Sequence, residues 1–358
     1  MMRRALALAR RGEGRVEPNP MVGCVIVRGD RVIGEGWHRR FGGPHAEIDA
    51  LRRCTGSPRG ATCYVTLEPC CHHGKTPPCT DALIAAGVRR VVAAMRDPFP
   101  RVAGGGLKAL GRAGIRVDVG LLAEEAAVIN APFLKWVVTG RPWVILKWAQ
   151  SLDGKIAPRD GASRWITSAA SRREAHLLRG RVDAVMVGIG TVLSDDPMLT
   201  CRDAPTRRTA ARVVLDSRLR TPLRSKLVRT SRRIPTLIFT SVAAPAARRR
   251  ALESAGCEIV TLRGSKHGLS LTQLLDELGQ CGMTNVMVEG GGRLLGACFD
   301  AGLADEVVAF VAPRLIGGAA APGPLDGRGV ASMSGAHLLR MLKCRPCGPD
   351  QMWRARLK

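Results

Sequence analysis

The sequence predicts an α/β protein of two unlike domains, and three observations indicate this. The chain has 358 residues, whereas single hydrophobic cores stop growing at about 250–300 residues, so two cores are expected. Short strand-like runs alternate with helical ones along the chain, which is the order of α/β folds. The turn residues Thr139-Gly140-Arg141-Pro142 interrupt this pattern. We therefore place one domain at residues 1–140 and a second at residues 141–358.

The first domain is expected to begin with an amphipathic helix. Arg10 and Arg11 end the apolar run at residues 5–9 well before it reaches the length of a secretory signal. Strand-like and helical runs then alternate, and helical periodicity continues through residues 121–134. The expected strands are residues 22–27, 62–67 and 90–94, and the expected helices are residues 46–53 and 81–86.

The second domain repeats the α/β order without repeating the sequence, so the chain is not a duplication. A helix is expected at residues 293–299, after a glycine turn. The expected strands are residues 143–148, 184–187, 212–215, 236–239, 285–288 and 306–311.

The composition is that of an ordinary globular protein, with 46% hydrophobic and 24% charged residues. No apolar run reaches the 18 or more residues of a membrane span, since even residues 144–148 contain Lys147, and we expect a cytoplasmic protein without a membrane partner. The formal net charge is +25, which raises the alternative of an RNA partner. The arginines are spread along the chain and aromatic residues make up only 4%, so we expect a basic solvated surface and no specific nucleic acid.

The twelve cysteines are expected to be thiols or metal ligands, because they are scattered through a long chain without an export signal. Only Cys70, Cys71 and Cys79 lie near histidines. The pair Cys344 and Cys347 has C-x-x-C spacing but no second pair near it, and is interpreted as structural or incidental. Seven others have apolar neighbours and are expected to be small core residues: Cys24, Cys54, Cys63, Cys201, Cys257, Cys281 and Cys298.

A catalytic zinc site is predicted from His45, Cys70 and Cys79. One imidazole and two thiolates leave the fourth position of a tetrahedral zinc open, and water bound there has its pKa lowered toward neutrality. Glu47 lies two residues after His45 and is expected to be the proton shuttle, as in the H-x-E…P-C-x-x-C pattern of zinc nucleobase deaminases. A structural zinc finger is the alternative, but fingers close their fourth position.

The spacing departs from that pattern, since eight residues rather than two separate Cys70 from Cys79. At these residues, with Pro18-Asn19-Pro20-Met21-Val22-Gly23, the sequence resembles the bifunctional deaminase/reductase family of riboflavin biosynthesis, in which the long spacing is normal. The resemblance implies a cytidine-deaminase-like fold, zinc on His45, Cys70 and Cys79, Glu47 as acid/base, and Asn19 at the pyrimidine pocket. Three residues differ from the usual form: Cys71 replaces serine, Lys75 replaces arginine, and Phe99 replaces asparagine.

The resemblance continues through residues 147–155, 165–168, 183–197 and 289–292, and implies a dihydrofolate-reductase-like fold that uses NADPH. Physically, a strand at 285–288, a glycine turn and a helix place backbone N–H groups where phosphate binds. Gly188-Ile189-Gly190-Thr191 does not complete a Rossmann motif. The implied NADPH contacts are Ala149, Trp165, Thr191, Asp195, Ser217, Gly291, Gly292, Arg293, Leu294, Leu295, Gly296 and Ala297. The implied substrate contacts are Ser163, Arg179, Leu199, Arg202 and Glu289.

The expected function is a two-step conversion of one phosphorylated aminopyrimidine. The first half deaminates 2,5-diamino-6-(5-phosphoribosylamino)pyrimidin-4-one, and the second half uses NADPH to reduce the ribosyl chain to its ribityl form. We expect a homo-oligomer that takes a small-molecule substrate. Two alternatives remain at this point: a reductase with a decayed deaminase half, and an RNA-associated zinc protein. The motifs at 147–155 and 289–292 favour the enzyme, since an RNA-associated protein has no use for them.

Overall fold

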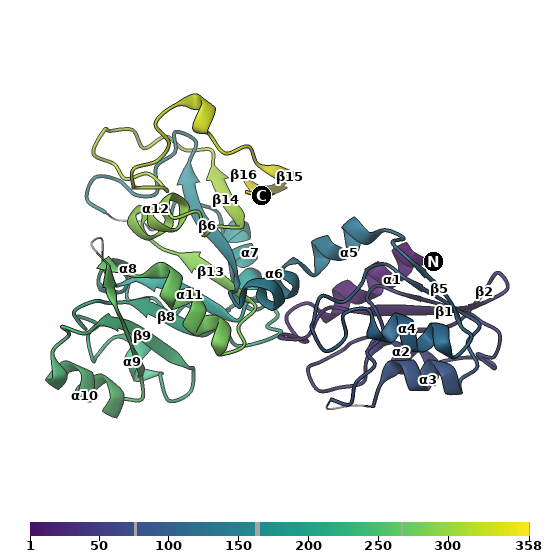
Figure 1. Ribbon diagram of the computed structural model, residues 1–358. Helices are drawn as coiled ribbons and strands as arrows, with labels where there is room; N and C mark the ends of the chain where they lie inside the picture. The colour runs from purple at the N-terminus through teal and green to yellow at the C-terminus, as the bar shows by residue number, and fades with distance from the viewer. Residues whose placement is uncertain (75–76, 162–164, 266–267, 358) are drawn as a thin grey trace. The chain divides into compact units, whose positions relative to one another are not determined.

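The computed structural model describes residues 1–74, 77–161, 165–265 and 268–357. The chain divides into two compact units, Met1–Gly140 and Arg141–Lys358, and the turn at 139–142 lies at this division (Figure 1). Within the described residues, none of the helices has the length and apolar character needed to cross a bilayer.

The first unit is built on a five-stranded sheet with the order β2-β1-β3-β4-β5. β1 pairs antiparallel with β2 and β3, whereas β3, β4 and β5 are parallel. The strands are β1 (Gly23–Arg28), β2 (Arg31–Trp37), β3 (Thr62–Val65), β4 (Arg90–Ala93) and β5 (Arg116–Val119). The helices are α1 (Met2–Ala9), η1 (Arg10–Gly12), α2 (Ala46–Arg52), α3 (Cys79–Ala85), α4 (Gly105–Arg112), α5 (Ala123–Ile129) and α6 (Ala131–Thr139).

Two hydrophobic cores cover the two faces of this sheet. Successive side chains of a strand point to opposite faces, and β1 accordingly contributes Ile26 to one core and Val25 to the other. The Ile26 core includes Leu83 of α3 and Leu110 of α4, and the Val25 core includes residues of α1 and α5. The Ile26 core also includes Ala46 and Ala50 of α2. The helices α2 and α3 therefore pack on the same face, and two of the predicted zinc ligands, His45 and Cys79, lie where these helices begin.

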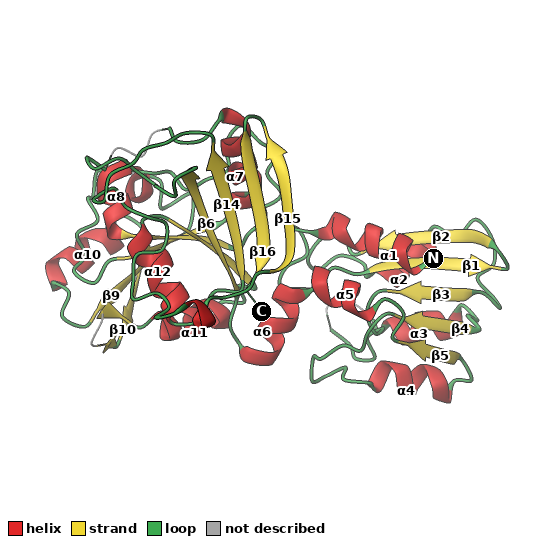
Figure 2. Ribbon diagram, turned by 90° about the horizontal axis from the view of Figure 1, so that it is seen from above, coloured by secondary structure: helices red, strands yellow, loops and turns green. Residues whose placement is uncertain are grey.

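The second unit contains a nine-stranded sheet with the order β10-β9-β8-β7-β13-β6-β14-β16-β15. The first seven strands of this order are parallel, and β16 and β15 continue the sheet as an antiparallel hairpin at its edge (Figure 2). The strands are β6 (Trp143–Ser151), β7 (Ala184–Gly188), β8 (Ala211–Leu215), β9 (Thr236–Ser241), β10 (Glu258–Leu262), β13 (Asn285–Glu289), β14 (Glu306–Ala312), β15 (Arg340–Cys347) and β16 (Asp350–Arg356). A separate pair consists of β11 (Gly264–Ser265) and β12 (Gly268–Leu269).

Helices cover both faces of the large sheet. One core joins β7 to α7 and α10, and the other joins β7 to α11 and α12. The helices are α7 (Ala169–Arg179), α8 (Ile189–Asp195), α9 (Lys226–Arg229), α10 (Ala246–Ser254), α11 (Leu271–Gln280), α12 (Gly292–Asp300) and the short η2 (Met333–Gly335). Because the seven parallel strands share one direction, their carboxyl ends lie along one edge, where loops and helix starts gather.

The structure confirms the predicted α/β class, but the sequence analysis missed the strands β2, β5, β10, β15 and β16 and the short pair β11 and β12. β2 contains Gly34 and Gly36, which hide its strand pattern. The single helical stretch predicted at 121–134 is two helices, because the chain breaks at Asn130, whose side chain bonds the backbone of Met21.

The cysteines differ from expectation at two places. Cys281 is exposed, whereas Cys24, Cys63, Cys257 and Cys298 are buried. Cys344 and Cys347 do not lie in a tail but on β15, where Cys344 is exposed and Cys347 is buried. Side chains three residues apart on a strand point to opposite faces, so these two thiols do not form a redox pair.

Candidate functional site

The structure brings the three predicted zinc ligands together in the first unit. His45 is the residue before α2, Cys70 follows β3, and Cys79 is the first residue of α3. The ligand atoms of all three lie within 4.8 Å of one another, and His45 Nδ1 is 3.4 Å from Cys70 Sγ and 3.3 Å from Cys79 Sγ. Tetrahedral zinc with Zn–S and Zn–N bonds of about 2.3 and 2.0 Å requires its nitrogen and sulfur ligands to be about 3.5 Å apart. The three residues therefore fit zinc.

Close packing and backbone hydrogen bonds hold these ligands in place. A Cβ at Gly36 of β2 would lie 2.3 Å from the backbone N of Ala50, so only glycine lets α2 approach the sheet this closely. The carbonyl of Cys70 accepts from the backbone N–H of Thr80 at 3.2 Å and from its hydroxyl at 3.3 Å. The backbone N–H of Cys79 lies 3.4 Å from Cys70 Sγ. The two helix starts and the end of β3 thus meet at one point.

The electrostatics suit metal binding by a thiolate. The hydrogen bond from Cys79 is the largest cause that lowers the pKa of Cys70, to about 4, and His45 lowers it further. The same interaction, together with burial, raises the pKa of Cys79, so Cys70 is the thiol that loses its proton more readily. Since metals bind the thiolate, Cys70 is already in its ligand form at neutral pH.

Glu47 lies in the first turn of α2, beside the ligands. Its side chain is 3% exposed and interacts with Cys79. Burial is the main cause that raises its pKa to about 7, against the lowering effect of His45. A carboxyl group with a pKa near the working pH both accepts and releases a proton readily, which is the property that an acid/base catalyst needs.

Sequence analysis missed His38, which links Asn19 to the metal site. His38 Nδ1 lies 3.0 Å from the carbonyl oxygen of Pro44, and Nε2 lies 3.1 Å from Asn19 Nδ2. A carbonyl can only accept, so Nδ1 carries the proton and Nε2 accepts from the Asn19 amide. The rings of His38 and His45 meet edge to face, with centroids 5.4 Å apart. His38 thus sits between Asn19 and the zinc ligand, but a lone histidine at the end of β2 carries no sequence signal.

Cys71 does not join the metal cluster, which among the described residues consists of His45, Cys70 and Cys79. Its sulfur instead approaches the carbonyl oxygen of Arg101, at 4.0 Å. Phe99 is half-buried and its ring lies 6.4 Å from the ring of His72. Lys75 lies outside the described residues.

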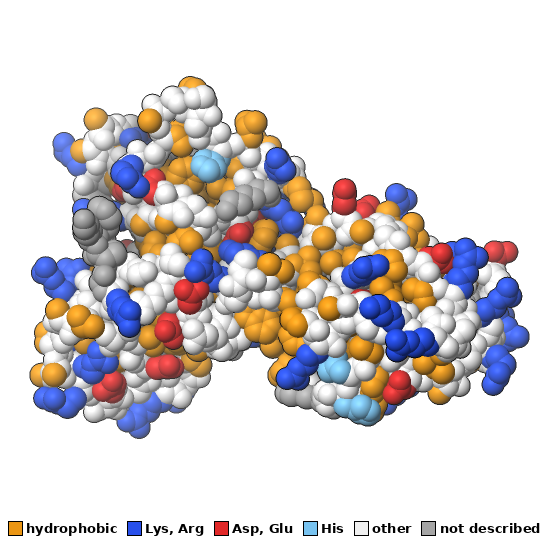
Figure 3. Space-filling model, viewed as in Figure 1, with side chains coloured by type: hydrophobic (Ala, Val, Ile, Leu, Met, Phe, Trp, Pro, Cys, Tyr) orange, Lys and Arg blue, Asp and Glu red, His pale blue; other side chains and the backbone are white. Residues whose placement is uncertain are grey.

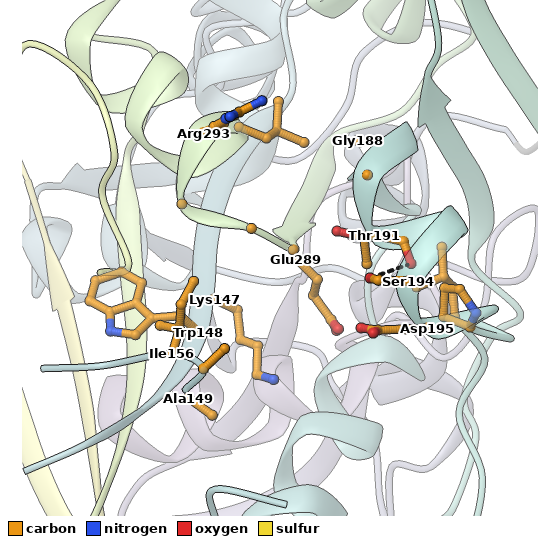
Figure 4. A pocket seen from close by; sticks show the side chains of 18 of the residues that line it. Lys147, Trp148, Ala149, Ile156, Gly188, Thr191, Ser194, Asp195, Glu289 and Arg293 are labelled. Carbon is orange, nitrogen blue, oxygen red and sulfur yellow. Dashed lines mark hydrogen bonds between the residues drawn. The ribbon is translucent and has the colours of Figure 1, made fainter. Parts of the chain in front are cut away.

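The second unit contains a cavity of about 2140 Å³ at the carboxyl ends of the parallel strands. Figure 4 shows Lys147 of β6, Thr191 and Asp195 of α8, and Glu289 of β13 around it. Such a volume exceeds the 300–1,000 Å³ that is typical of a pocket for a single small ligand, as expected for a dinucleotide beside a substrate.

A buried ion pair lies in this cavity. Arg179 at the end of α7 donates two hydrogen bonds to Glu289, of 2.8 and 2.5 Å. Burial acts to raise the pKa of Glu289, but Arg179 and Lys147 outweigh it and hold the pKa at about 2. Burial also lowers the pKa of Lys147. Lys147 was not among the predicted site residues, although a lysine in the apolar run 143–148 was a usable signal.

Most of the residues expected at the cofactor and substrate line the cavity, but three do not. Ser217 does not line the cavity, and Leu295 is fully buried in the core. Gly296 faces the backbone of Asp326, whose carbonyl oxygen would lie 2.0 Å from a Cβ added at Gly296. Ser163 lies outside the described residues. The expected residues that line the cavity are Ala149, Trp165, Arg179, Thr191, Asp195, Leu199, Arg202, Glu289, Gly291, Gly292, Arg293, Leu294 and Ala297.

The glycine run before α12 serves two purposes. Gly290 has φ of 140°, a conformation that other residues rarely adopt, and a Cβ there would approach the Thr191 hydroxyl at 2.9 Å. A Cβ at Gly292 would lie 2.5 Å from the carbonyl oxygen of Gly323. The run therefore brings β13 close to α8 and lets the segment around Asp326 pack against α12.

Positive side chains do not form a single patch on the face of the molecule that Figure 3 draws. On the face seen in Figure 3, the lysines and arginines are dispersed over both units among neutral and acidic residues. This agrees with their even distribution along the sequence.

Both units match known protein families. Residues 1–95 match the cytidine and deoxycytidylate deaminase zinc-binding region, and residues 142–352 match the RibD C-terminal domain. The second match alone covers more than half of the chain. It begins two residues after the turn at Gly140.

Similar proteins cover almost the whole chain. The riboflavin biosynthesis protein RibD of Escherichia coli is 43% identical over 98% of this chain and 96% of its own. The RibD structure from Acinetobacter baumannii has a TM-score of 0.88 at 38% identity, covering 99% of this chain and 97% of that one. The diaminohydroxyphosphoribosylaminopyrimidine deaminase/5-amino-6-(5-phosphoribosylamino)uracil reductase of Thermotoga maritima has a TM-score of 0.85 at 36% identity, with coverage of 99% and 97%.

Proposed function

The chain belongs to the RibD family of riboflavin biosynthesis proteins, and from this membership we propose how its two units divide the work. The protein is a bifunctional enzyme, a hydrolytic deaminase and a reductase, with zinc and NADPH as cofactors. Residues 1–140 form the deaminase and residues 141–358 the reductase. The substrate is 2,5-diamino-6-(5-phosphoribosylamino)pyrimidin-4-one, and the final product is 5-amino-6-(5-phosphoribitylamino)uracil.

In the deaminase, His45, Cys70 and Cys79 hold zinc, which supplies an activated water for hydrolysis when bound. Glu47 moves two protons in turn: its buried carboxyl group carries one from the attacking water to the ring nitrogen, and a second from the resulting hydroxyl to the amino group, which departs as ammonia. Asn19 donates its amide to His38, which leaves its carbonyl oxygen free to bind the pyrimidine. The assembled ligand cluster with Glu47 beside it favours an active deaminase over a decayed one.

In the reductase, NADPH supplies the hydride when bound. The protein binds and orients the two reactants and excludes water. Gly291 and the start of α12 present backbone N–H groups to the cofactor phosphates, and Thr191 and Asp195 bind it from α8. Arg202 binds the substrate phosphate, and the Arg179–Glu289 pair fixes the ribosyl chain.

The observation that carries the proposal is the presence, in one chain, of the three-ligand cluster with Glu47 and of the large cavity with its ion pair. The test supplies the diaminopyrimidinone phosphate and NADPH and follows ammonia release and NADPH consumption separately. We expect ammonia without NADPH, and NADPH consumption only after deamination or when the deaminated intermediate is supplied. NADPH consumption without ammonia release would mean that only the reductase functions.

We further infer a homo-oligomer without a specific nucleic-acid or membrane partner. β15 is the outermost strand of its sheet, and all its residues except Cys347 are exposed. Exposed apolar side chains gather on and before it, and edge strands with apolar side chains pair readily with other strands. These side chains are Val330, Met333, Leu338, Leu339, Met341 and Leu342. Light scattering should give a mass above that of one chain, and Leu338→Glu with Leu342→Glu should reduce it.

We place the enzyme in the cytoplasm, because the two zinc thiolates have to stay reduced and reducing compartments preserve thiols. Fractionation of cells followed by detection of the protein tests this assignment.

A further inference from the structure

A buried carboxylate next to the zinc site has a role that the chemistry of deamination does not explain. Glu68 lies two residues before Cys70, and its side chain is 3% exposed. Among the described residues, no basic side chain bonds to it, and its two oxygens accept from backbone N–H groups. The donors are Gly106 at 2.9 Å and Leu107 at 3.2 Å on one oxygen, and Gly104 at 3.1 Å and Asp97 at 3.2 Å on the other.

All four donors belong to one segment, residues 97–107, which follows β4 and includes the first residues of α4. The segment approaches the chain of Glu68 very closely, since a Cβ at Gly106 would lie 2.0 Å from the carbonyl oxygen of Pro69. Gly104 has φ of 87°, which turns the chain so that N–H groups on both sides of it face the carboxylate. Glu68 therefore acts as the anchor of this segment.

The anchored segment packs against Cys71 and His72, the two residues that follow the zinc ligand Cys70. The sulfur of Cys71 lies 4.0 Å from the carbonyl oxygen of Arg101, and the ring of His72 faces that of Phe99 with centroids 6.4 Å apart. Asp97 is buried at the start of the segment. The residues that follow Cys70 are thus packed against residues 97–105.

Cys70 itself is held by other groups. Its carbonyl accepts from the backbone and hydroxyl of Thr80, and its sulfur accepts from the backbone of Cys79. These bonds come from α3 and do not involve Glu68. Loss of the Glu68 carboxylate should therefore free residues 97–107 to move, while the metal ligands stay in place.

We propose that Glu68 is a positioning residue of the deaminase, which holds residues 97–107 as one wall of the pyrimidine pocket and acts on substrate binding rather than on the metal. The proposal rests on the deaminase function proposed above. It assigns to Glu68 no contact with the substrate and no proton transfer.

The test is Glu68→Gln in the full-length zinc enzyme, since glutamine keeps the size but offers one oxygen instead of two. We expect one zinc per chain as in the wild type, a KM for the diaminopyrimidinone phosphate raised about tenfold or more, and a smaller change in kcat. A tenfold change corresponds to the loss of about one hydrogen bond to a charged group. Hydrogen exchange of the backbone amides in residues 97–107 should be faster, because some of these N–H groups lose the carboxylate oxygen to which they donate.

Two further variants test the segment with Glu68 retained and control for the loss of a carboxylate. Gly106→Ala retains Glu68 but forces a Cβ against Pro69, and should raise KM and exchange in the same segment. Glu124→Gln removes an exposed carboxylate of the same unit and should change neither. Circular dichroism and zinc content of each variant report on the folding of the first unit, and reductase activity with the deaminated intermediate reports on the second.

The outcomes separate the two proposals. Unchanged exchange and unchanged KM in Glu68→Gln, or loss of zinc with intact reductase activity, would overturn the positioning role. A wild-type enzyme that releases no ammonia would instead contradict the proposed deaminase function. In that case the exchange of residues 97–107 still decides whether Glu68 anchors the segment.

Discussion

The two sites differ in how the chain builds them. The zinc site uses four residues within a stretch of 35: His45 and Glu47 at the start of α2, Cys70 in the loop after β3, and Cys79 at the start of α3. The reductase cavity takes its lining from residues between Lys147 and Arg328, which belong to five of the parallel strands (β6, β7, β8, β13 and β14) and to helices and loops between them. The first arrangement concentrates function in a few groups with defined chemistry. The second distributes it over many contacts, so single changes should have smaller effects there.

The largest effect is expected for Cys79→Ser, because it removes one of three ligands and leaves too few to hold zinc for catalysis. Metal analysis should show loss of zinc, and ammonia release should fall to background while the reductase still consumes NADPH. Cys71→Ser is the matched control, since its sulfur lies outside the cluster, and it should keep zinc and activity. Loss of zinc in the control and its retention in Cys79→Ser would refute the ligand assignment.

Glu47→Gln should have the next largest effect. The variant keeps the shape of the side chain but cannot transfer the proton, so the deamination rate should fall by a factor on the order of 10²–10⁴. Zinc content should stay at one per chain. Reduction of the supplied intermediate should be unchanged. A parallel loss of reduction in a folded variant would mean that the two sites are coupled and would contradict their independence.

A smaller effect is expected for Arg202→Ala in the cavity. The variant loses one charge-assisted contact to the substrate phosphate, which should raise the reductase KM by roughly 10- to 100-fold. Deamination should continue, so the aminouracil ribosylamine should accumulate, as chromatography of the reaction mixture can show. Arg218→Ala, an exposed arginine that does not line the cavity, serves as control. Equal KM values for the two variants would remove Arg202 from the substrate site.

The smallest effect is expected when the units are separated. Residues 141–358 contain their own cores and the complete described cavity, so this fragment should fold and reduce the deaminated intermediate at nearly the rate of the full chain. Circular dichroism and NADPH consumption measure both properties. An insoluble or inactive fragment would show that the reductase depends on the first unit.

The sequence alone was informative where function depends on local spacing. His45, Glu47, Cys70 and Cys79 could be predicted because zinc chemistry restricts the residue types, and the family resemblance accounts for the long interval between the two cysteines. The strands β7, β8, β9, β13 and β14 were predicted because buried parallel strands are continuous apolar runs. The edge hairpin of β15 and β16 escaped notice, because its exposed face lacks such a run.

Other features depend on which distant segments meet. Nothing in the sequence pairs Glu68 with the amides of residues 97–107, or His38 with Asn19, since these contacts join residues up to 39 positions apart. The same holds for Arg179 and Glu289, which lie 110 positions apart and pair only because α7 ends beside β13. For the glycine run at 290–292, the sequence predicted a turn, but its packing against Thr191 and Gly323 became evident only in three dimensions.

The sequence by itself thus determined the fold class, the chemistry of the metal site and the family, because these follow from residue type, local order and spacing. Only the tertiary structure decided which expected residues face the cavity, as Leu295 and Gly296 show by facing the core and Asp326 instead. It also decided which buried charges have partners. The physical reason is that burial and hydrogen bonding depend on which atoms are close in space. Positions in the sequence do not give these distances when strands from remote segments are neighbours in one sheet.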